Sequence, residues 1–554
     1  MGEKPVVRVV DLDLPRKPTS AIRTVSPTPL LEVDLEARGY GQSHEEWKPQ
    51  KQEWFIMISL AIISLMVALD ATILVTVLPT IAKALEGSSI DAFWAGTSFL
   101  LSSAVFQPVI ASVSEVFGRQ QLLLLSLTFF TVGTILCAIS TDFTLLLVGR
   151  SIQGVGGGGI ITMSQVIFCD IVPLRQRPKY FSIVLGAWSV GSILGPVVGG
   201  ALCQNSTWRW VFYINFPFCF LGFVLGFLFV RLDSASELTV AQKLRQTDWL
   251  GAVLFLGGMS SALIGLSWGG IQYSWVSAQT LVPIIVGGLS VAVFVAWQLY
   301  VQPKSLLPMS IFASSSAVAA FYCALVNGLI LFTALYYVPF FCMSIRSSSP
   351  TKAGIDLFPA LFFLLPGSIL VSVLTTRLGQ FRWAIWSGWA IGTVGCGLFF
   401  LFDLHTNIVL WAVALSIFGI GTGMVLTSVN VGIQAISKAE DCAMAASMYG
   451  FMRSLGMPLG VAVSGTVFQN AMSARLALVG LPTAIAHDSE RYIHVLHTMD
   501  PADPKRVAIL DAYLEGFRGV WLLITLASAS ALAVSIFIKK HSMNKVLLSK
   551  YTAH

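Results

Sequence analysis

The sequence predicts an all-α polytopic membrane protein, and three observations lead to this fold class. Hydrophobic residues make up 55% of the 554 residues and charged residues only 11%, whereas soluble domains carry roughly 25% charged residues. Apolar runs of about 20 residues, the length of a membrane-spanning helix, recur along the whole chain. Glycine and proline lie inside several of these runs, where membrane helices tolerate them better than soluble helices do. We therefore expect lipid to be the solvent of this chain.

The apolar runs predict about fourteen spanning helices, with boundaries that are soft by several residues. The first six runs are 54–79, 92–113, 121–140, 144–168, 180–202 and 211–231. Two more follow at 248–268 and 281–301, and the last six are 313–342, 354–375, 383–402, 407–430, 443–468 and 517–538. The run at 313–342 is long enough to be tilted, or to be broken near Pro339.

Glycine-containing patterns indicate that the two halves of the chain repeat each other. The echoed patterns lie around Gly118, Gly154 and Gly195 in the first half and around Gly379, Gly419 and Gly456 in the second. Their offsets cluster at roughly 260–270 residues, as expected for an internal repeat. We therefore predict two six-helix bundles plus two inserted helices. The predicted ranges are 51–232 for the first bundle, 233–312 for the linker with the extra helix pair, and 313–540 for the second bundle.

The remaining parts of the chain are two tails and one long loop. Residues 1–50 are rich in proline and charge, so we expect a disordered cytosolic tail. The second bundle includes a long external loop at 469–516, and residues 541–554 form a cytosolic C-terminal tail. No Lys- or Arg-rich run of the kind that binds nucleic acid is present, and loop topology explains the net charge of +6. We therefore expect no nucleic-acid partner.

Basic residues predict the orientation of the chain in the membrane. With a cytosolic N-terminus, the inward short loops hold most of the arginine and lysine, including Arg175, Arg177 and Lys179, which satisfies the positive-inside rule. Both termini then face the cytosol. Asn205 begins an Asn-Ser-Thr sequon on the external side and is a candidate for glycosylation, although it lies close to the membrane. We expect the plasma membrane, with the vacuolar membrane as the alternative.

No pattern typical of a cofactor or metal site is present in the sequence. The eight cysteines are scattered without a Cys-x-x-Cys pair, and we interpret them as packing residues. The external loop at 469–516 holds a group of residues that could bind a metal, although such residues also gather in polar loops by chance, and we expect no metal: His487, Asp488, His494, His497 and Asp500. The sequence contains no ATP-binding motif. Any process that this protein drives must therefore take its energy from an ion gradient, which we expect to be the proton gradient, or from the gradient of a substrate. None of the seven histidines falls well inside a predicted span, so we expect no enzyme activity.

Charged and amide residues inside the spans are candidates for proton coupling. Asp70 lies past the midpoint of the first span, where an ionised carboxylate costs roughly 2.5–3.5 kcal/mol on insertion scales. We expect it to face a water-filled cavity and to exchange a proton, and the alternative is a structural hydrogen bond. Arg150 and Gln153, one turn apart, could share that network or form a salt-bridge staple. Arg453 lines the cavity or snorkels toward the cytosol.

The fifth predicted span carries an unusual set of helix-breaking residues. They are Gly186, Gly191, Gly195, Pro196, Gly199 and Gly200. Glycine costs a soluble helix roughly 1 kcal/mol relative to alanine, whereas in membranes small residues let helices approach closely. The pattern predicts either a bendable hinge or a rigid packing seam.

Aromatic and amide residues inside the spans are candidates for an adaptable binding cavity. The alternative for each is ordinary packing or a place in the interfacial belt. The candidates, besides Arg453, are Trp188, Asn327, Tyr336, Tyr337, Asn430 and Tyr449.

Taken together, five motifs resemble those of a known family. They are Leu69-Asp70-Ala71-Thr72-Ile73, the loop from Ala111 to Gln121, Arg150 to Gly154, Gly191 to Gly200, and Trp208 to Pro217. On these residues the chain resembles the major facilitator superfamily, specifically the fourteen-span drug:proton antiporter branch and its fungal efflux pumps. The resemblance extends from about residue 54 to residue 540. The loop motif is degraded, because Glu115 replaces the usual Asp and Ala111 a Gly.

The resemblance implies a cytosolic gate formed by Glu115, Gly118, Arg119 and Asp170. We expect these groups to be exposed, so that each ion pair is worth on the order of 1 kcal/mol or less. A bias of that size suits a gate that has to open.

The resemblance also implies a function. It points to a secondary active transporter that exports a hydrophobic secondary metabolite, toxin or drug by proton antiport with alternating access. Its partners would be the lipid bilayer, the substrate and protons, and we expect a monomer. An uptake permease, such as a siderophore transporter, or a vacuolar amino-acid transporter of the same fold remains the alternative.

Overall fold

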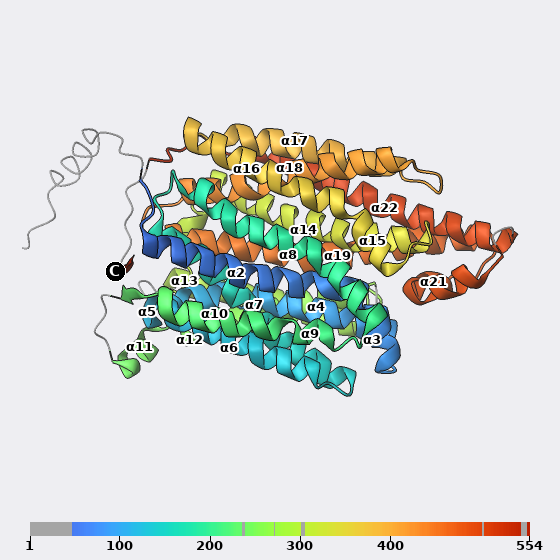
Figure 1. Cartoon of the computed structure of the whole chain (residues 1–554), viewed down its shortest axis with the longest axis horizontal. Helices are drawn as coiled ribbons and strands as arrows, with labels where there is room; N and C mark the ends of the chain where they lie inside the picture. The colour runs from blue at the N-terminus through green and yellow to red at the C-terminus, as the bar shows by residue number, and fades with distance from the viewer. Residues whose placement is uncertain are drawn as a thin grey trace, which may run out of the picture. The chain divides into compact units, whose positions relative to one another are not determined.

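Helices make up almost all of the described chain. The computed structural model describes residues 47–234, 239–270, 272–300, 305–500, 503–544 and 551–553, and it confirms the all-α fold class (Figure 1). The strands found within these ranges, β1 (Leu232–Ser234) and β2 (Tyr551–Ala553), pair in antiparallel fashion. The predicted tail at 1–50 lies outside the described residues as far as residue 46.

The helices follow the predicted order of bundle, inserted pair and bundle. The first group is α2 (Lys51–Ile73), η1 (Leu74–Thr76), α3 (Leu78–Ala84), α4 (Ser89–Val105), α5 (Gln107–Phe117), α6 (Arg119–Ala138), α7 (Phe143–Ile171), α8 (Arg177–Asn205), α9 (Trp210–Tyr213) and α10 (Asn215–Phe229). The middle group is α11 (Val240–Gln246), α12 (Trp249–Trp268) and α13 (Ala278–Tyr300). The last group is η2 (Met309–Phe312), α14 (Ser315–Ser344), α15 (Pro350–Asp356), α16 (Phe358–Leu378), α17 (Arg382–Leu398), η3 (Phe399–Leu401), α18 (Ile408–Ile436), α19 (Cys442–Leu478), α20 (Ala484–His487), α21 (Ser489–Thr498) and α22 (Pro504–Ser535).

The second predicted span is bent in the structure. The segments Trp94–Val105 and Gln107–Phe117 meet at 43°. Pro108 lies in the first turn of α5, where its missing N–H interrupts the helical hydrogen-bond ladder. Within the described residues, 13 helices are long and apolar enough to cross a membrane, or 14 spans with this pair counted as one. The chain is therefore a multi-pass membrane protein.

Two helices are longer than their apolar runs predicted. α19 continues to Leu478 and α22 begins at Pro504, so the connection between them is much shorter than the predicted loop at 469–516. Both helices continue beyond their apolar runs as polar extensions. Arg475 in the extension of α19 pairs with Asp511 in the extension of α22 at 2.6 Å. By contrast, α14 is a single helix through Pro339, so the break considered there is not present.

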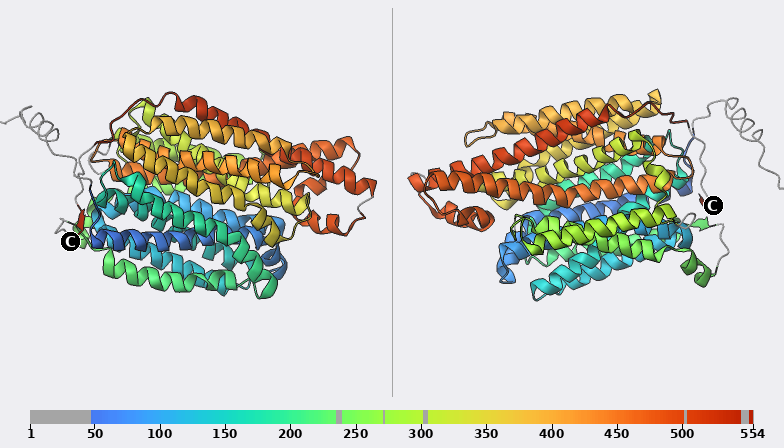
Figure 2. Two further views of the ribbon diagram at one scale, coloured as in Figure 1. Left: turned by 45° about the horizontal axis from the view of Figure 1, so that its top comes forward. Right: turned by 180° about the vertical axis from the view of Figure 1, so that it is seen from behind.

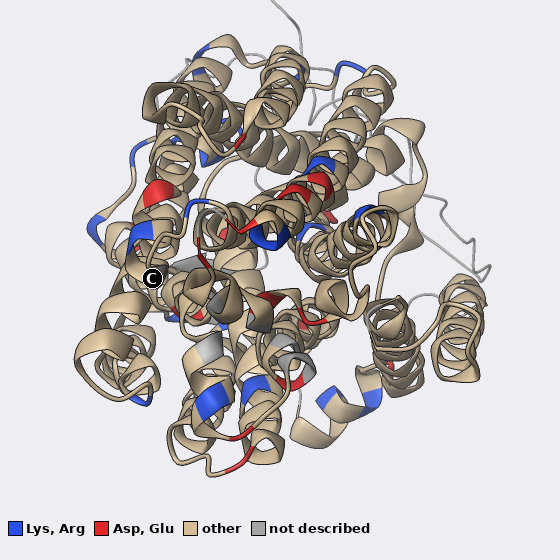
Figure 3. Cartoon of the chain, turned by 90° about the vertical axis from the view of Figure 1, so that its right-hand side faces the viewer, with Lys and Arg blue, Asp and Glu red and all other residues tan. Residues whose placement is uncertain are grey.

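The helices run between two ends that we name for the argument below. The terminal end is where α2 begins and α22 finishes, and the loop end carries α21 (Figure 1). The two further views show the spanning helices running side by side between these ends (Figure 2). Seen from the loop end, most of the ribbon is uncharged (Figure 3).

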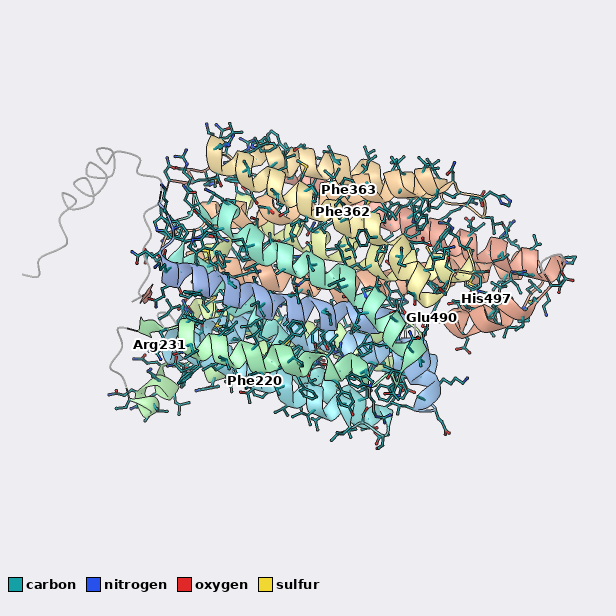
Figure 4. All side chains as sticks on the ribbon, viewed as in Figure 1. Phe220, Arg231, Phe362, Phe363, Glu490 and His497 are labelled. Carbon is teal, nitrogen blue, oxygen red and sulfur yellow. The ribbon has the colours of Figure 1, made fainter. Side chains whose placement is uncertain are left out.

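Apolar side chains cover the flanks of the bundles. Phe220 of α10 is 73% exposed and Phe362 of α16 is 50% exposed, and both lie along the sides of the structure, with Arg231 near the terminal end (Figure 4). Such exposure would be a liability in water. It is the surface expected of a protein whose flanks face lipid tails.

The inserted helix pair packs beside the interface of the two bundles. Phe255 of α12 contacts Phe451 of α19, with ring centroids 5.5 Å apart. The Thr466 hydroxyl of α19 donates to the Gly269 carbonyl at the end of α12 at 3.2 Å. α13 is largely exposed, and its small Gly287 lies against the backbone of α12. The pair therefore packs on the outside of the two bundles and does not enter between them.

Candidate functional site

A buried carboxylate lies at the centre of a hydrogen-bond network in the first bundle. Asp70 of α2 is 0% exposed. Its Oδ2 atom accepts a hydrogen bond from Arg150 Nη1 at 2.7 Å, and its Oδ1 atom accepts from Gln153 Nε2 at 2.9 Å and from Asn215 Nδ2 at 2.8 Å. The sequence singled out Asp70, Arg150 and Gln153, and the structure brings all three together with Asn215 of α10.

Arg150 is fixed in position by several further contacts. Its Nη1 atom also donates to Gln153 Oε1 at 2.6 Å, and its Nε atom donates to the Ala95 carbonyl at 3.1 Å. The guanidinium lies 4.3 Å from the ring centroid of Phe99. Breaking a buried ion pair by removing one partner typically costs about 3–5 kcal/mol, because the other charge is left unpaired. The protonation state of Asp70 therefore determines whether Arg150 has a counter-ion.

A cavity lies between the two bundles, next to this network. Its empty space, including the part open to solvent, is about 610 Å³. Residues that line it come from both bundles and include Ala71, Thr72, Gly96, Pro196, Leu335, Tyr336 and Val461. Ala71 follows Asp70 along α2, and Gly96 follows the carbonyl that Arg150 contacts. The network thus lies directly behind the wall of this cavity, which we call the larger cavity.

Three glycines of α8 let this helix lie directly against α2. A Cβ atom added at Gly191, Gly195 or Gly199 would lie within 2.5 Å of an α2 atom. At Gly191 and Gly199 the obstructing atoms are the backbone oxygens of Leu65 and Ile73, which cannot rotate away. The glycines therefore form a packing seam between α8 and the helix that carries Asp70.

Of the remaining residues of this motif, Gly186 and Gly200 face the second bundle, whereas the Pro196 carbonyl faces the first. A Cβ atom at Gly200 would meet Thr351 Oγ1 at 2.9 Å, whereas one at Gly186 would have Leu365 at 3.4 Å as its nearest neighbour. The Pro196 carbonyl accepts a hydrogen bond from the Thr76 hydroxyl at 3.0 Å. α8 is a single helix from its first residue to its last, and the hinge role of the motif stays a prediction.

Arg119 and Asp170 form an ion pair at the terminal end. Arg119 Nε donates to Asp170 Oδ2 at 2.9 Å, and its Nη1 atom donates to Ser114 Oγ at 2.5 Å. Gly118 precedes them with a φ of 109°, a conformation that favours glycine. The predicted exposure is wrong for this pair, since the two side chains are 3% and 7% exposed, although Glu115 is exposed. Because neighbouring helix ends cover it, the pair costs more to break than a surface pair does.

Arg177, also at the terminal end, connects the two bundles. The side chain, at the start of α8, is 5% exposed. Within its own bundle it donates to the carbonyls of Val172 at 2.7 Å and Cys169 at 2.6 Å. Across the interface its Nη1 atom donates to Gln434 Oε1 of α18 and to Cys442 Sγ of α19, both at 2.8 Å.

Replacing Arg177 with methionine is expected to open the terminal end more often. The variant loses two charged hydrogen bonds between the bundles, each typically worth about 1.5–3 kcal/mol. The Cys442 thiol, buried behind Arg177, should then react with N-ethylmaleimide at least about tenfold faster, as measured by peptide mass spectrometry. The matched control is Lys438→Met, which changes an exposed cation near the same end. Equal reaction rates in both variants would contradict a gating role for Arg177.

Arg453 and Trp188 face each other across the bundle interface. The Arg453 guanidinium of α19 lies 4.7 Å from the ring centroid of Trp188 of α8. Arg453 is 7% exposed, so it points into the protein and does not snorkel. This contact joins two residues that the sequence named separately as cavity candidates.

The other cavity candidates divide into two groups. Tyr336 lines the larger cavity, and Asn430 lines a smaller one toward the terminal end. Asn327, Tyr337 and Tyr449 are buried inside the second bundle. The Tyr449 hydroxyl donates to a backbone carbonyl at 2.8 Å and the Asn327 amide to another at 3.4 Å, as packing residues do.

Helix α21 contacts the wall of the larger cavity at the loop end. The Tyr336 hydroxyl donates to the Glu490 carboxylate, and His497 Nε2 lies 3.0 Å from the Met343 carbonyl (Figure 4). Burial raises the pKa of the Glu490 carboxyl, and the Tyr336 hydrogen bond acts in the opposite direction.

Asn205, the candidate glycosylation site, is exposed at the end of α8.

The contact between α21 and α14 is expected to loosen as the pH rises. Because the pKa of Glu490 is raised in the folded protein, its protonated form is favoured there. The contact is most stable at acidic pH and loses stability as the pH rises through the raised pKa. Hydrogen exchange of residues 489–498, corrected for intrinsic rates, should increase with pH in the wild type and stay low in Glu490→Gln. The same pH dependence in both proteins would exclude Glu490 as the cause.

Asn215, Arg177 and Glu490 were not recognised as site residues from the sequence. Asn215 left a usable signal, because it is an amide inside the apolar run 211–231. Arg177 looked like one of several basic loop residues. Glu490 carried no local signal, since its burial depends on where α21 packs.

Comparison with known proteins establishes the family. The sequence profile of the Major Facilitator Superfamily matches residues 60–461. MFS transporter L2 of Phoma sp. is 39% identical over 531 residues, which cover 95% of this chain and 88% of that protein. Efflux pump FUS6 of Gibberella moniliformis is 31% identical over 510 residues (91% and 90%). The Acurin A biosynthesis cluster MFS-type transporter of Aspergillus aculeatus is 31% identical over 506 residues (90% and 91%). The chain therefore belongs to the Major Facilitator Superfamily.

Proposed function

We propose that this transporter exports hydrophobic secondary metabolites, toxins or drugs from the cytosol in exchange for protons. The observation that carries the proposal is the buried ion pair of Asp70 and Arg150, at 2.7 Å, beside a cavity between two bundles. Ionisable residues inside a membrane are expensive and mark ion pathways. The name of Efflux pump FUS6 supports export, and that of the Acurin A biosynthesis cluster transporter supports a secondary metabolite as the substrate.

Proton binding at Asp70 provides a physical basis for coupling. A proton that arrives from the loop end through the larger cavity neutralises the carboxylate, and Arg150 then loses its buried counter-ion. Loss of this counter-ion changes the free energy of the conformation by several kcal/mol. A free-energy change of that size shifts a two-state equilibrium strongly. Release of the proton toward the terminal end restores the ion pair and completes the cycle.

The gates determine which end of the cavity is open. We propose that the contacts of Arg177 between the bundles keep the terminal end closed, with the Arg119–Asp170 pair bracing the first bundle at this end. We propose that proton binding favours the rearrangement of the two bundles that opens this end to the cytosol. Substrate would then bind from the cytosol and leave at the loop end after the reverse movement.

We place the loop end outside the cell and both termini in the cytosol. The basic residues of the short loops at the terminal end support this orientation. We expect the plasma membrane as the location and a monomer as the working unit. The proton gradient supplies the energy, without a bound cofactor.

Transport in membrane vesicles of known orientation tests the direction and the energy source. Inside-out vesicles that contain the protein, loaded to be acidic inside, should accumulate apolar fungal metabolites from a test panel. Accumulation should stop when a protonophore removes the gradient, and right-side-out vesicles should show exclusion. Accumulation by right-side-out vesicles would contradict export, and accumulation unaffected by the protonophore would contradict proton antiport.

A further inference from the structure

Arg453 is a buried cation without a counter-ion among the residues that the structure describes. Its Nε and Nη2 atoms are buried and make no hydrogen bond to any described residue. None of the ion pairs found among the described residues involves it. Of the other buried arginines, Arg119 and Arg150 each pair with a carboxylate, and Arg177 donates hydrogen bonds to two carbonyls, an amide oxygen and a thiol. An uncompensated buried charge costs several kcal/mol, so it calls for a functional explanation.

The backbone at Arg453 packs closely against α14, and the side chain extends the other way. A Cβ atom at Gly328 of α14 would lie 1.9 Å from the Arg453 carbonyl. α14 therefore packs against the backbone of α19 at this level. The side chain extends to the other bundle, where the face of Trp188 lies 4.7 Å away. The cation is thus presented at the interface between the bundles, stacked on an apolar aromatic surface.

Two amide oxygens without a partner among the described residues lie beside Gly450, one helical turn before Arg453. Gln107 of α5 uses its Nε2 atom to donate to Ser454 at 2.8 Å, but its Oε1 atom has no partner. Gln165 of α7 also has an unpartnered Oε1 atom. A Cβ atom on Gly450 would lie 3.0 Å from the first and 3.2 Å from the second of these amides. Gln165 also lines the smaller cavity.

We infer that Arg453, stacked on Trp188 and flanked by Gln107 and Gln165, recognises an anionic group of the transported molecule. The inference rests on the proposed transport function and names its substrate class, an amphipathic organic acid. The guanidinium fork suits a carboxylate or an acidic enol, which it binds through parallel hydrogen bonds. The free amide oxygens suit hydroxyl groups next to that acid. The indole of Trp188 provides an apolar surface for the rest of the molecule.

A negatively charged substrate also fits the direction of transport. A membrane potential that is negative in the cytosol favours the exit of an anion, by about 2.3 kcal/mol per charge for each 100 mV. The exchange of an outgoing anion for an incoming proton would move two charges across the membrane in each cycle. The same potential therefore assists both halves of the exchange.

Equilibrium binding of matched probe pairs tests the inference without any proton gradient. The full chain is placed in lipid nanodiscs and exposed to tritiated 1-naphthylacetate and 1-pyrenebutyrate, and to the primary amides of both acids. Each amide matches its acid in shape but lacks the charge. We expect at least one acid to bind about thirtyfold more tightly than its amide, since hydrogen bonds to charged groups are the stronger ones. Empty nanodiscs provide the blank.

Substitutions in α19 test whether Arg453 causes the preference for the acid over its amide. Arg453→Gln should lower the acid-to-amide ratio to less than about threefold, while Arg453→Lys keeps part of it. Arg475→Gln changes a half-exposed arginine of the same helix and should keep the full ratio. Size-exclusion profiles report folding, and if Arg453→Gln does not fold, the wild-type ratio and Arg453→Lys carry the test.

Three results would overturn the inference. They are equal binding of acid and amide for both pairs in the wild type, an unchanged ratio in Arg453→Gln, or an equal loss for acid and amide in that variant. Because the measurement uses no gradient, a failure of proton coupling leaves it intact. Proton-coupled export of neutral compounds without a preference for acids would reject the inference and keep the proposed function.

Discussion

Replacing Asp70 with asparagine is expected to reduce gradient-driven accumulation to that of vesicles without the protein. Asparagine keeps the shape of the side chain but cannot bind and release a proton. The coupling cycle would therefore lose its carrier, while substrate binding at the bundle interface would not depend on it. Accumulation in inside-out vesicles with and without a protonophore measures the loss. The matched control is Asp403→Asn, a carboxylate-to-amide change at an exposed loop position.

The same substitution is expected to lower stability, and a second variant separates the two effects. Asp70→Asn leaves the Arg150 guanidinium buried beside a neutral amide, at a cost of about 3–5 kcal/mol. Removing both charges in Asp70→Asn/Arg150→Gln should recover much of the thermal midpoint, because no unpaired charge remains. Transport should stay lost in the double variant. A double variant that regains gradient-driven transport would show that the pair serves stability alone.

Replacing Gly191 with alanine is expected to cost roughly 1–3 kcal/mol of stability, as overpacking typically does. The added Cβ atom would lie 2.5 Å from the Leu65 carbonyl oxygen of α2. Since that oxygen belongs to the backbone, α8 and α2 would have to move apart. The thermal midpoint of the purified protein, followed by size-exclusion chromatography, measures the effect. Movement of α2 would also displace Asp70, so we expect transport to fall together with stability.

Gly186 offers a matched control within the same helix. A Cβ atom there would meet Leu365 at 3.4 Å, which is an ordinary contact. Gly186→Ala gains the same helix propensity, about 1 kcal/mol in soluble helices, without the clash. It should leave the thermal midpoint unchanged or raise it. A similar loss in both variants would indicate that helix flexibility, and not the seam with α2, is what the glycines supply.

Most of the fold could be predicted because a bilayer leaves few choices. Backbone groups in lipid have to be satisfied within helices, so apolar runs such as 144–168 identify spans directly. Apolar runs do not reveal helical segments that are made of polar residues and lie outside the apolar part of the membrane. The last turns of α19, up to Leu478, are an example, because only the packing with α22 shows that the helix continues.

The candidate site was predictable where a polar residue interrupts an apolar run. Asp70, Arg150 and Arg453 stand out for this reason, since each is expensive to bury. Their partners did not stand out, because a hydrogen bond such as that from Asn215 depends on how α10 packs on α2. Arg177 shows the same limit, since its partners Gln434 and Cys442 lie on the other bundle. The sequence therefore identifies the charged residues that are expensive to bury, whereas only the fold shows which side chains pair with them.

Substrate-induced proton release tests the central claim most directly. Inside-out vesicles are loaded to be acidic inside, and a pH-sensitive dye reports the internal pH while an accumulated compound is added. We predict that the compound causes proton efflux through the wild-type protein and through Asp403→Asn, and none through Asp70→Asn. Efflux of the same size through Asp70→Asn, or uptake of the compound by the wild type without any efflux, would contradict proton antiport at Asp70.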